Sequence, residues 1–411
     1  MLRRMNALPK TPIKAWLPYL LGFLTAVGAL STDFYLPAFT MIEAEFHRSH
    51  GSAQITLATW FLGFACGQMI QGATTDWLGR RRPLLVGTAL YAAASLGCAF
   101  APGMATLALC RFFAAIGGAA SSVIPRAVVR DHADGHAAAG IMAQLTLVMG
   151  AAPILAPTLG GFLLKFVSWR ALFGICTGYG LIGLGLVYFF LPETLPPKSR
   201  HAVDVAAAAR RYAGILREPN FAAHVFMSSA AMFTIFSFVA GSPALILAYH
   251  ISPARLGSLL MLAAIPYITA AQLNPRLLAL FGTDRVIRTA VTVAAVAGLS
   301  LFAAASLWHL TLPVLMGFVM VNAFGIGLIM PNSSISALSR HARSAGSASA
   351  LAGTLNFLSV ALCSSLGGML ANGTVRPIAE MLVCGTVPLL AAQWVRVRVR
   401  ARLAREIPNL A

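Results

Sequence analysis

Charged residues, and acidic residues above all, are scarce in this sequence. Of 411 residues only 12 are Asp or Glu, and charged residues together make up 10%, whereas soluble domains carry about 25%. Hydrophobic residues make up 58%, so a water-soluble fold would lack the polar side chains to cover its surface. The composition therefore predicts an integral membrane protein and excludes a large extramembrane enzyme domain.

Cysteine is also infrequent, and its placement excludes two classes of site. Each of the 6 cysteines lies inside an apolar run rather than in a loop with a partner, as buried thiols do when they act as small hydrophobic side chains. Neither a disulfide framework nor a metal-ligand spacing is present. None of the 9 histidines forms a metal-like pair. We expect no metal and no cofactor.

Long apolar runs dominate the rest of the chain, and a membrane-spanning helix needs about 20 such residues. Runs between polar breaks predict an all-α protein with twelve transmembrane helices. They cover residues 16–38, 52–75, 83–102, 104–125, 137–164, 170–191, 221–243, 256–275, 286–307, 313–337, 347–371 and 378–395. The first run is about 23 residues long and exceeds the apolar core of a cleaved signal peptide, so we expect it to remain as the first helix.

The net charge of +18 would suggest nucleic-acid binding only if the basic residues shared one soluble face. Instead, most of the 30 Lys and Arg residues fall in the loops of one side, which the positive-inside rule places in the cytoplasm together with both termini. The basicity is therefore a topology signal, and we expect no nucleic-acid partner.

A duplication is visible around the polar midpoint stretch 192–220. Gly79 and its basic cluster resemble Gly282 and the residues after it, and Leu159-Gly160-Gly161 resembles Leu366-Gly367-Gly368 at a similar offset. We therefore expect a six-helix bundle over 1–191, a cytoplasmic linker over 192–220 and a second six-helix bundle over 221–411. Secondary transporters built from such repeats hold their substrate between the halves.

Two charged residues lie deep within the predicted spans, away from their ends. Asp33 is the only such acid, and Arg111 is the only such basic residue. At about 1.5 Å per residue they would lie ~7 and ~10 Å below the outer helix ends. A charge in hydrocarbon is costly and marks function by default. For Arg111, a structural role in bonding backbone carbonyls is as good an interpretation as direct coupling.

The loop after the second span carries a dense motif. It runs from Gly72 through Asp76 and Gly79 to Arg80 and Arg81. Gly72 would allow close helix approach, Asp76 would face a helix N-terminus, and the arginines would anchor at the phosphate level. The segment resembles the loop motif of the major facilitator superfamily, which has a basic residue where this chain has a Trp.

The fifth span carries Pro153, Pro157, Gly160 and Gly161. Two prolines four residues apart break backbone hydrogen bonds on one helix face, and the glycines allow tight crossing. The pattern resembles the antiporter motif of the same superfamily. A generic helix kink is the alternative interpretation.

Further segments resemble the bicyclomycin-resistance (Bcr/CflA) type of drug:proton antiporter. They are Ser-Thr-Asp-Phe-Tyr-Leu-Pro-Ala over 31–38, Arg-Phe-Phe over 111–113, Glu-Thr-Leu over 193–195 and Gly-Ser-Ala-Ser-Ala-Leu over 346–351. The resemblance implies a bacterial inner-membrane protein that exchanges a small drug molecule for protons, with Asp33 and Arg111 in proton coupling. Ala114 and Ala115 depart from the polar residue and Gly frequent in that family.

Polar and aromatic side chains in mid-span are candidates for a substrate cavity. These are Thr56, Thr59, Trp60, Phe233, Phe236 and Asn322. For the aromatic residues ordinary packing is an equal alternative. We expect a monomer surrounded by membrane lipid, and not an enzyme, because no intramembrane nucleophile, base or metal cluster is visible. An exporter or importer of a small endogenous metabolite is the alternative function.

Overall fold

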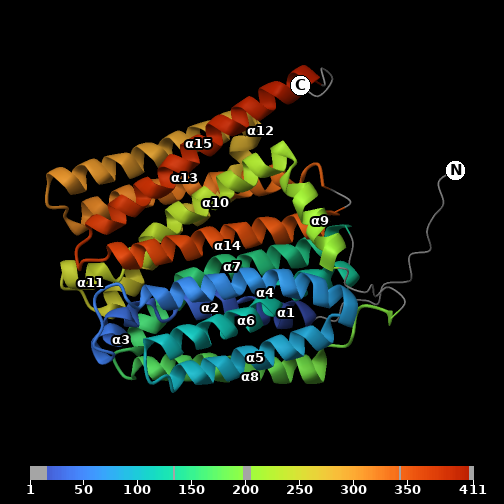
Figure 1. Ribbon diagram of the computed structural model, residues 1–411, viewed down its shortest axis with the longest axis horizontal. Helices are drawn as coiled ribbons and strands as arrows, with labels where there is room; N and C mark the ends of the chain where they lie inside the picture. Colours follow the sequence, from blue (N-terminus) through green and yellow to red (C-terminus); the bar gives the residue numbers. More distant parts are fainter. Residues whose placement is uncertain (1–15, 133–134, 198–204, 342–343, 407–411) are drawn as a thin grey trace.

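The computed structural model describes residues 16–132, 135–197, 205–341 and 344–406 (Figure 1). Within these ranges the chain forms α-helices and one short 3-10 helix, with no strand. The helices are α1 (Leu17–Thr25), α2 (Val27–Asp33), η1 (Leu36–Ala38), α3 (Phe39–Glu45), α4 (Gln54–Leu78), α5 (Arg81–Ala99), α6 (Met104–His132), α7 (Gly135–Leu163), α8 (Trp169–Phe190), α9 (Val205–Leu216), α10 (Pro219–Gly241), α11 (Ala244–Ala248), α12 (Pro253–Leu307), α13 (Leu312–Leu338), α14 (Ala345–Leu370) and α15 (Arg376–Glu406).

The predicted transmembrane architecture is confirmed. Nine segments of the described chain are long and apolar enough to cross a membrane. One of them, α12, reverses at Gly282, where φ is +74°, and so supplies two passes. The more polar helices α4 and α5 run beside α6 as two further passes, which gives twelve in all.

The first span differs from the single helix expected over 16–38. It is interrupted after Thr25 and again after Asp33, passes through η1 at Pro37, and continues to Glu45. The hydroxyls of Thr25 and Thr32 donate to the carbonyls of Leu21 and Gly28 on their own turns, a contact that often bends helices. The break leaves Asp33 as the last residue of α2.

Figure 1 shows α1–α6 and α8 on one side of the molecule and α10, α12, α13 and α15 on the other, with α7 and α14 between them. The two sides meet where α4 packs against α14 and where α7 packs against the first pass of α12. We call the end where α4 ends and α12 reverses the basic end, because Arg80, Arg396 and Arg400 lie there.

At the other end, glycines bring the two sides together. A Cβ on Gly257 would lie 2.8 Å from the Cα of Thr158, and one on Gly161 would lie 2.9 Å from the carbonyl carbon of Pro253. In the second crossing, a Cβ on Gly368 would lie 2.9 Å from the carbonyl oxygen of Gly51. Such distances admit only glycine, so these helices are in backbone contact. We call these four glycines the glycine seal.

The basic end lacks this close packing. A Cβ added at Gly72 of α4 or at Gly346 of α14 would meet nothing within 4 Å. The close helix approach expected at Gly72 is therefore wrong for this conformation. The tight glycine contacts of α4 are instead at Gly63 and Gly67, whose missing side chains admit the backbone of α6.

Candidate functional site

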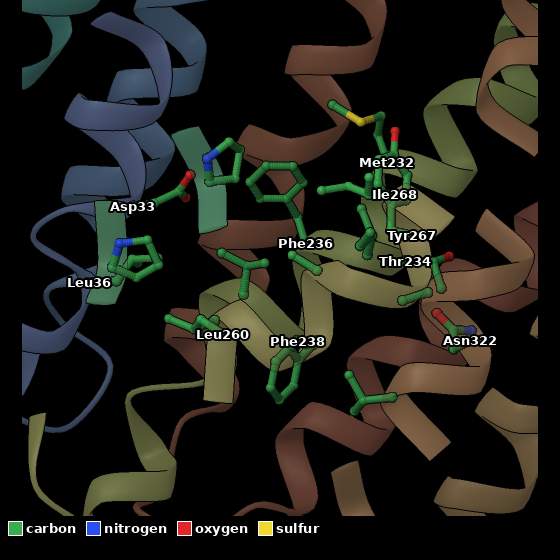
Figure 2. Close-up of a pocket in the computed structure, with 18 of the residues that line it drawn as sticks. Asp33, Leu36, Met232, Thr234, Phe236, Phe238, Leu260, Tyr267, Ile268 and Asn322 are labelled. Carbon is green, nitrogen blue, oxygen red and sulfur yellow. The ribbon is translucent and has the colours of Figure 1, made fainter. Parts of the chain in front are cut away.

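A cavity of about 270 Å³ lies between the two sides of the molecule (Figure 2). Asp33 and Leu36, from α2 and η1, form one end, and α7 contributes residues from Met149 to Pro157. The remaining wall comes from α10, α12, α13 and α15. Most of the lining is aliphatic or aromatic, with few polar side chains, which is the usual composition of a small-molecule site.

Asp33 is the acidic residue of this cavity. Its side chain is buried, with 9% of the residue exposed, and its hydrogen-bonding neighbour is Thr32. Among the described residues no ion pair joins Asp33 to Arg111 or to another base. Its position at the C-terminal end of α2 adds the negative end of a helix dipole to the burial. The site therefore presents an acid without a neutralising cation.

Arg111 lies outside the cavity in an aromatic cage. Its guanidinium carbon is 4.4 Å from the ring centroid of Tyr35 and 4.2 Å from that of Trp60, with Phe173 at 5.8 Å. The residue is 2% exposed, and its Nε and Nη2 have no hydrogen-bond partner. Contact with ring faces stabilises a desolvated cation. Arg111 thus packs against Tyr35, two residues beyond Asp33, rather than against Asp33 itself.

The structure divides the six residues proposed for the cavity into two groups. Phe236 and Asn322 line it. The others lie elsewhere, because their side chains are engaged by neighbours: Thr56 bonds the Tyr35 hydroxyl at 2.9 Å, Thr59 bonds the Thr56 carbonyl, Trp60 lies against Arg111, and Phe233 packs with Cys363 and Met381.

The glycine and proline motif of α7 contacts both the cavity and Asp33's segment. Pro153 and Pro157 line the cavity. A Cβ on Gly160 would overlap the carbonyl oxygen of Phe34, the residue after Asp33, and Gly161 belongs to the glycine seal. α7 is therefore in direct contact with the backbone next to Asp33.

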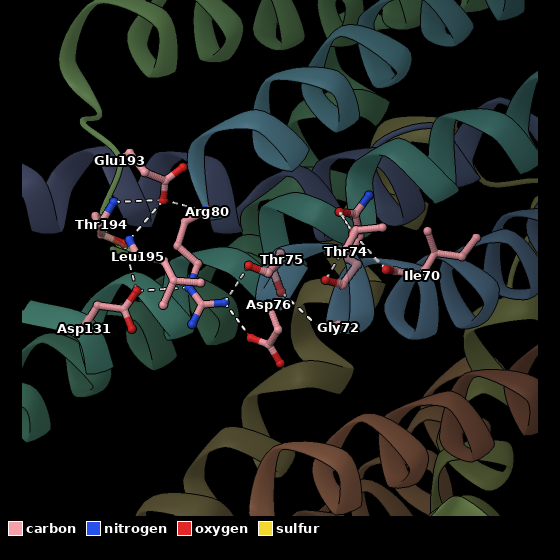
Figure 3. A network of polar contacts seen from close by, with 11 residues as sticks. Ile70, Gly72, Thr74, Thr75, Asp76, Arg80, Asp131, Glu193, Thr194 and Leu195 are labelled. Atoms are coloured by element: carbon pink, nitrogen blue, oxygen red, sulfur yellow. Dashed lines mark hydrogen bonds and ion pairs between the residues drawn. The ribbon is translucent and has the colours of Figure 1, made fainter. Parts of the chain in front are cut away.

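A polar network closes the α4–α5 turn at the basic end (Figure 3). Arg80 is 8% exposed; its Nε donates to Asp131 at 3.0 Å and its Nη1 to Asp76 at 2.8 Å. Burial opposes the charge of Arg80, but its hydrogen bonds to the carboxylates of Asp131 and Asp76 and their negative charges outweigh this effect, so the pKa of the guanidinium is raised above its usual value. Contrary to the expectation of a phosphate-level anchor, Arg80 is a buried ion-pair centre.

Glu193, rather than Asp76, covers the N-terminus of α5. Its carboxylate accepts from the backbone N–H groups of Arg80 at 2.8 Å and Arg81 at 3.4 Å. Gly79 precedes them with φ at +92°, and a Cβ there would overlap this carboxylate. A glycine is needed at position 79 for two physical reasons, the left-handed backbone and the space that Glu193 fills.

The second repeat has a matching turn with the charges reversed. Gly282 adopts a left-handed conformation like that of Gly79, and the same offset that relates these glycines relates Glu193 to Arg396. Here Asp284 accepts from the buried Arg396 at 2.8 Å and lies 2.9 Å from Arg400. The Gly79–Gly282 similarity in the sequence was the available signal for this cluster, but it did not reveal the partners.

The fold and its buried acid define a multi-pass membrane transporter, and comparison with known proteins gives the family. The profile of the Major Facilitator Superfamily matches residues 21–364, so the chain belongs to this superfamily of transporters, which are not enzymes. It is 29% identical to a "Bicyclomycin resistance protein homolog" of Haemophilus influenzae over 92% of this chain and 95% of that protein.

Other relatives have similar coverage. An "Uncharacterized MFS-type transporter YdgK" of Bacillus subtilis is 29% identical over 91% of this chain and 94% of its own, and the "Multidrug resistance protein MdtL" of Escherichia coli is 26% identical over 88% and 91%. Among solved structures, a peptide transporter POT complex with sulfate superposes with a TM-score of 0.75 at 14% identity, covering 97% of both chains. A bacterial homolog of the lysosomal transporter Spinster, inward-facing and occupied, gives 0.72 at 15%, covering 95% and 97%. These structures support the fold alone.

Proposed function

We propose that this protein is a proton-coupled antiporter that exports drug-like small molecules from the bacterial cytoplasm. The observation that carries the proposal is Asp33, a buried acid without a cationic partner among the described residues, in an apolar cavity between the two sides of the molecule. Such an acid can be protonated when the cavity is empty and ionised when a substrate is bound. Relatives named for bicyclomycin and multidrug resistance support this interpretation.

The direction of transport rests on the charge distribution. The positive-inside rule assigns the basic end to the cytoplasm, with both termini on that side and the chain in the inner membrane. In this orientation the glycine seal closes the external side, and the loosely packed helix ends at Gly72 and Gly346 face the cytoplasm. The conformation is then the inward-facing one, which receives substrate from the cytoplasm.

Exchange at Asp33 supplies the energy coupling. A low-dielectric cavity disfavours the carboxylate, so Asp33 holds a proton when the cavity is empty and releases it to the cytoplasm as substrate binds. After the molecule opens to the outside, a new proton displaces the substrate. One proton moving inward across 100 mV supplies about 2.3 kcal/mol.

Arg111 has a positioning role in this proposal. Its guanidinium lies against the rings of Tyr35 and Trp60, and Gly160 is in close contact with the Phe34 carbonyl. The segment that carries Asp33 is thus held on one side by Arg111 and on the other by the α7 motif. Proton coupling at Asp33 would depend on both contacts.

We retain the division into bundles over 1–191 and 221–411 joined by the linker 192–220, with a monomer in membrane lipid as the working unit. The packing of α4 on α14 and of α7 on α12 would be the interface across which the two bundles rock.

The test is a drug-susceptibility panel in an efflux-deficient bacterial host, followed by transport in inverted membrane vesicles. Wild type should raise resistance to some compounds, and the same compounds should enter vesicles only with a proton gradient. Asp33→Asn should reach the membrane in equal amount and lose gradient-driven uptake. Efflux by Asp33→Asn at the wild-type rate would refute the proposal, and no resistance to any compound would favour transport of an endogenous metabolite.

A further inference from the structure

The cavity has a second polar end, remote from Asp33, formed by Asn322 of α13 and Thr234 of α10 (Figure 2). Both residues are buried, with 3% and 0% of their surface exposed. Between them and Asp33 the wall is largely apolar, including Phe236 and Met232. A molecule that fills the cavity therefore meets polar groups at its two ends and, along the wall, the hydroxyl of Tyr267.

At this far end one N–H of the Asn322 amide and the Thr234 hydroxyl are already used as donors. Asn322 Nδ2 donates to the carbonyl of Ala294 at 2.9 Å, and the Thr234 hydroxyl donates to the carbonyl of Ala230 at 2.8 Å. Thr234 is fully buried and its hydroxyl lies against Gly385 of α15, so the amide of Asn322 is the group that this end offers to a ligand. Asn322 turns its oxygen toward the cavity and its nitrogen away from it (Figure 2).

The amide of Asn322 cannot reverse this arrangement. A flip would place Oδ1 against the Ala294 carbonyl, so that two acceptors would face each other. Within the described ranges no residue donates to Oδ1. An acceptor that a ligand buries without supplying a donor is unfavourable. A ligand with a donor at this end should therefore bind more tightly than a ligand with another acceptor there.

We propose that the far end is an acceptor subsite, at which Asn322 Oδ1 recognises a hydrogen-bond donor on the transported molecule. The class of ligand is a small aromatic compound with a hydroxyl or amide N–H at the end remote from Asp33. A carboxylate, ether or nitro group at that end is rejected. This inference rests on the proposed function, because it assigns the cavity to the transported molecule.

The experiment uses purified full-length protein in detergent and a matched series of probes. These are ω-phenylalkylamines of increasing chain length and their para-hydroxy counterparts, with binding measured by calorimetry. In wild type, the hydroxyl should tighten binding about tenfold, the effect of one net hydrogen bond, at the length that reaches the far end. Asn322→Leu should lose this gain and still bind the phenyl compound.

Tyr267→Phe is the matched control, because it removes another hydroxyl from the cavity wall and should keep the full gain. If Asn322→Leu does not accumulate, Asn322→Ala replaces it, because it removes the same acceptor without adding bulk, and it should also lose the gain. The inference is overturned if no chain length shows a hydroxyl gain, or if the gain survives in the variant.

The two proposals fail separately. If drugs are exported in exchange for protons but the hydroxyl gain is absent, the subsite is wrong and the transport function stands. If the gain is present and abolished by Asn322→Leu while no compound of the panel is exported, the subsite stands and drug efflux is wrong.

Discussion

Gly257→Ala tests the glycine seal, the contact that distinguishes the two ends of the molecule. The new Cβ would lie 2.8 Å from both the Cα of Thr158 and the carbonyl carbon of Pro157, a distance that forces α7 and α12 apart. Overpacking of this kind typically costs about 1–3 kcal/mol. The two helices separate when this end opens, so the overpacking destabilises the present conformation and not the state open at this end. The population ratio should shift by about 5- to 150-fold toward the state open at this end.

The shift can be measured as a distance distribution. Spin labels on Lys165→Cys and Arg255→Cys, two exposed positions flanking the seal, in a background without the native cysteines, report the separation of α7 and α12 by electron–electron double resonance. Gly178→Ala in α8 is the control, since its Cβ meets nothing within 4 Å. A distribution for Gly257→Ala that matches wild type and Gly178→Ala would refute the account of the seal.

Three further predictions concern the basic end. Gly72→Leu, which fills open space in this conformation, should fold normally and favour the state open at the basic end, as the same spectroscopy there would show. Arg80→Met should leave Asp131 without its cation and lower the free energy of unfolding by about 1–3 kcal/mol with unchanged drug affinity, measured by thermal unfolding and binding. Asp284→Asn should destabilise by a similar amount, because Arg396 is buried; equal melting temperatures for wild type and variant would contradict either stability prediction.

The sequence predicted the features that depend on position along a helix. The apolar runs located the passes, and the single deep acid located Asp33, because burial of one charge in hydrocarbon is recognisable without knowing its neighbours. Of the residues proposed for a substrate cavity, Asn322 and Phe236 line the cavity of the structure.

Features that depend on which helices are neighbours could not be predicted. Arg111 was a candidate partner of Asp33 by depth alone, and its actual partners, the rings of Tyr35, Trp60 and Phe173, come from three separate elements. The depth of a residue along a helix does not show which way the helix is rotated or which helices are its neighbours. The aromatic cage around Arg111 therefore could not be predicted from a single sequence.

The α5 cap illustrates the same limit over a longer range. Glu193 lies more than a hundred residues beyond Arg80 and Arg81, whose N–H groups it accepts. A local interpretation assigned that role to the nearer Asp76. Glu193 reaches the turn because α8 packs beside α5. The spacing of residues in the sequence does not predict which helices pack together.

The central claim is that Asp33 exchanges its proton for substrate, and proton release on binding tests it most directly. A compound found by the susceptibility panel is titrated into weakly buffered, detergent-solubilised protein at several pH values while released protons and affinity are recorded. If the substrate prefers ionised Asp33, binding releases protons, and by reciprocity the affinity falls by up to about tenfold per pH unit as the medium is acidified. Asp33→Asn should bind with no release and with an affinity independent of pH. The same proton release from Asp33→Asn as from wild type would contradict the account.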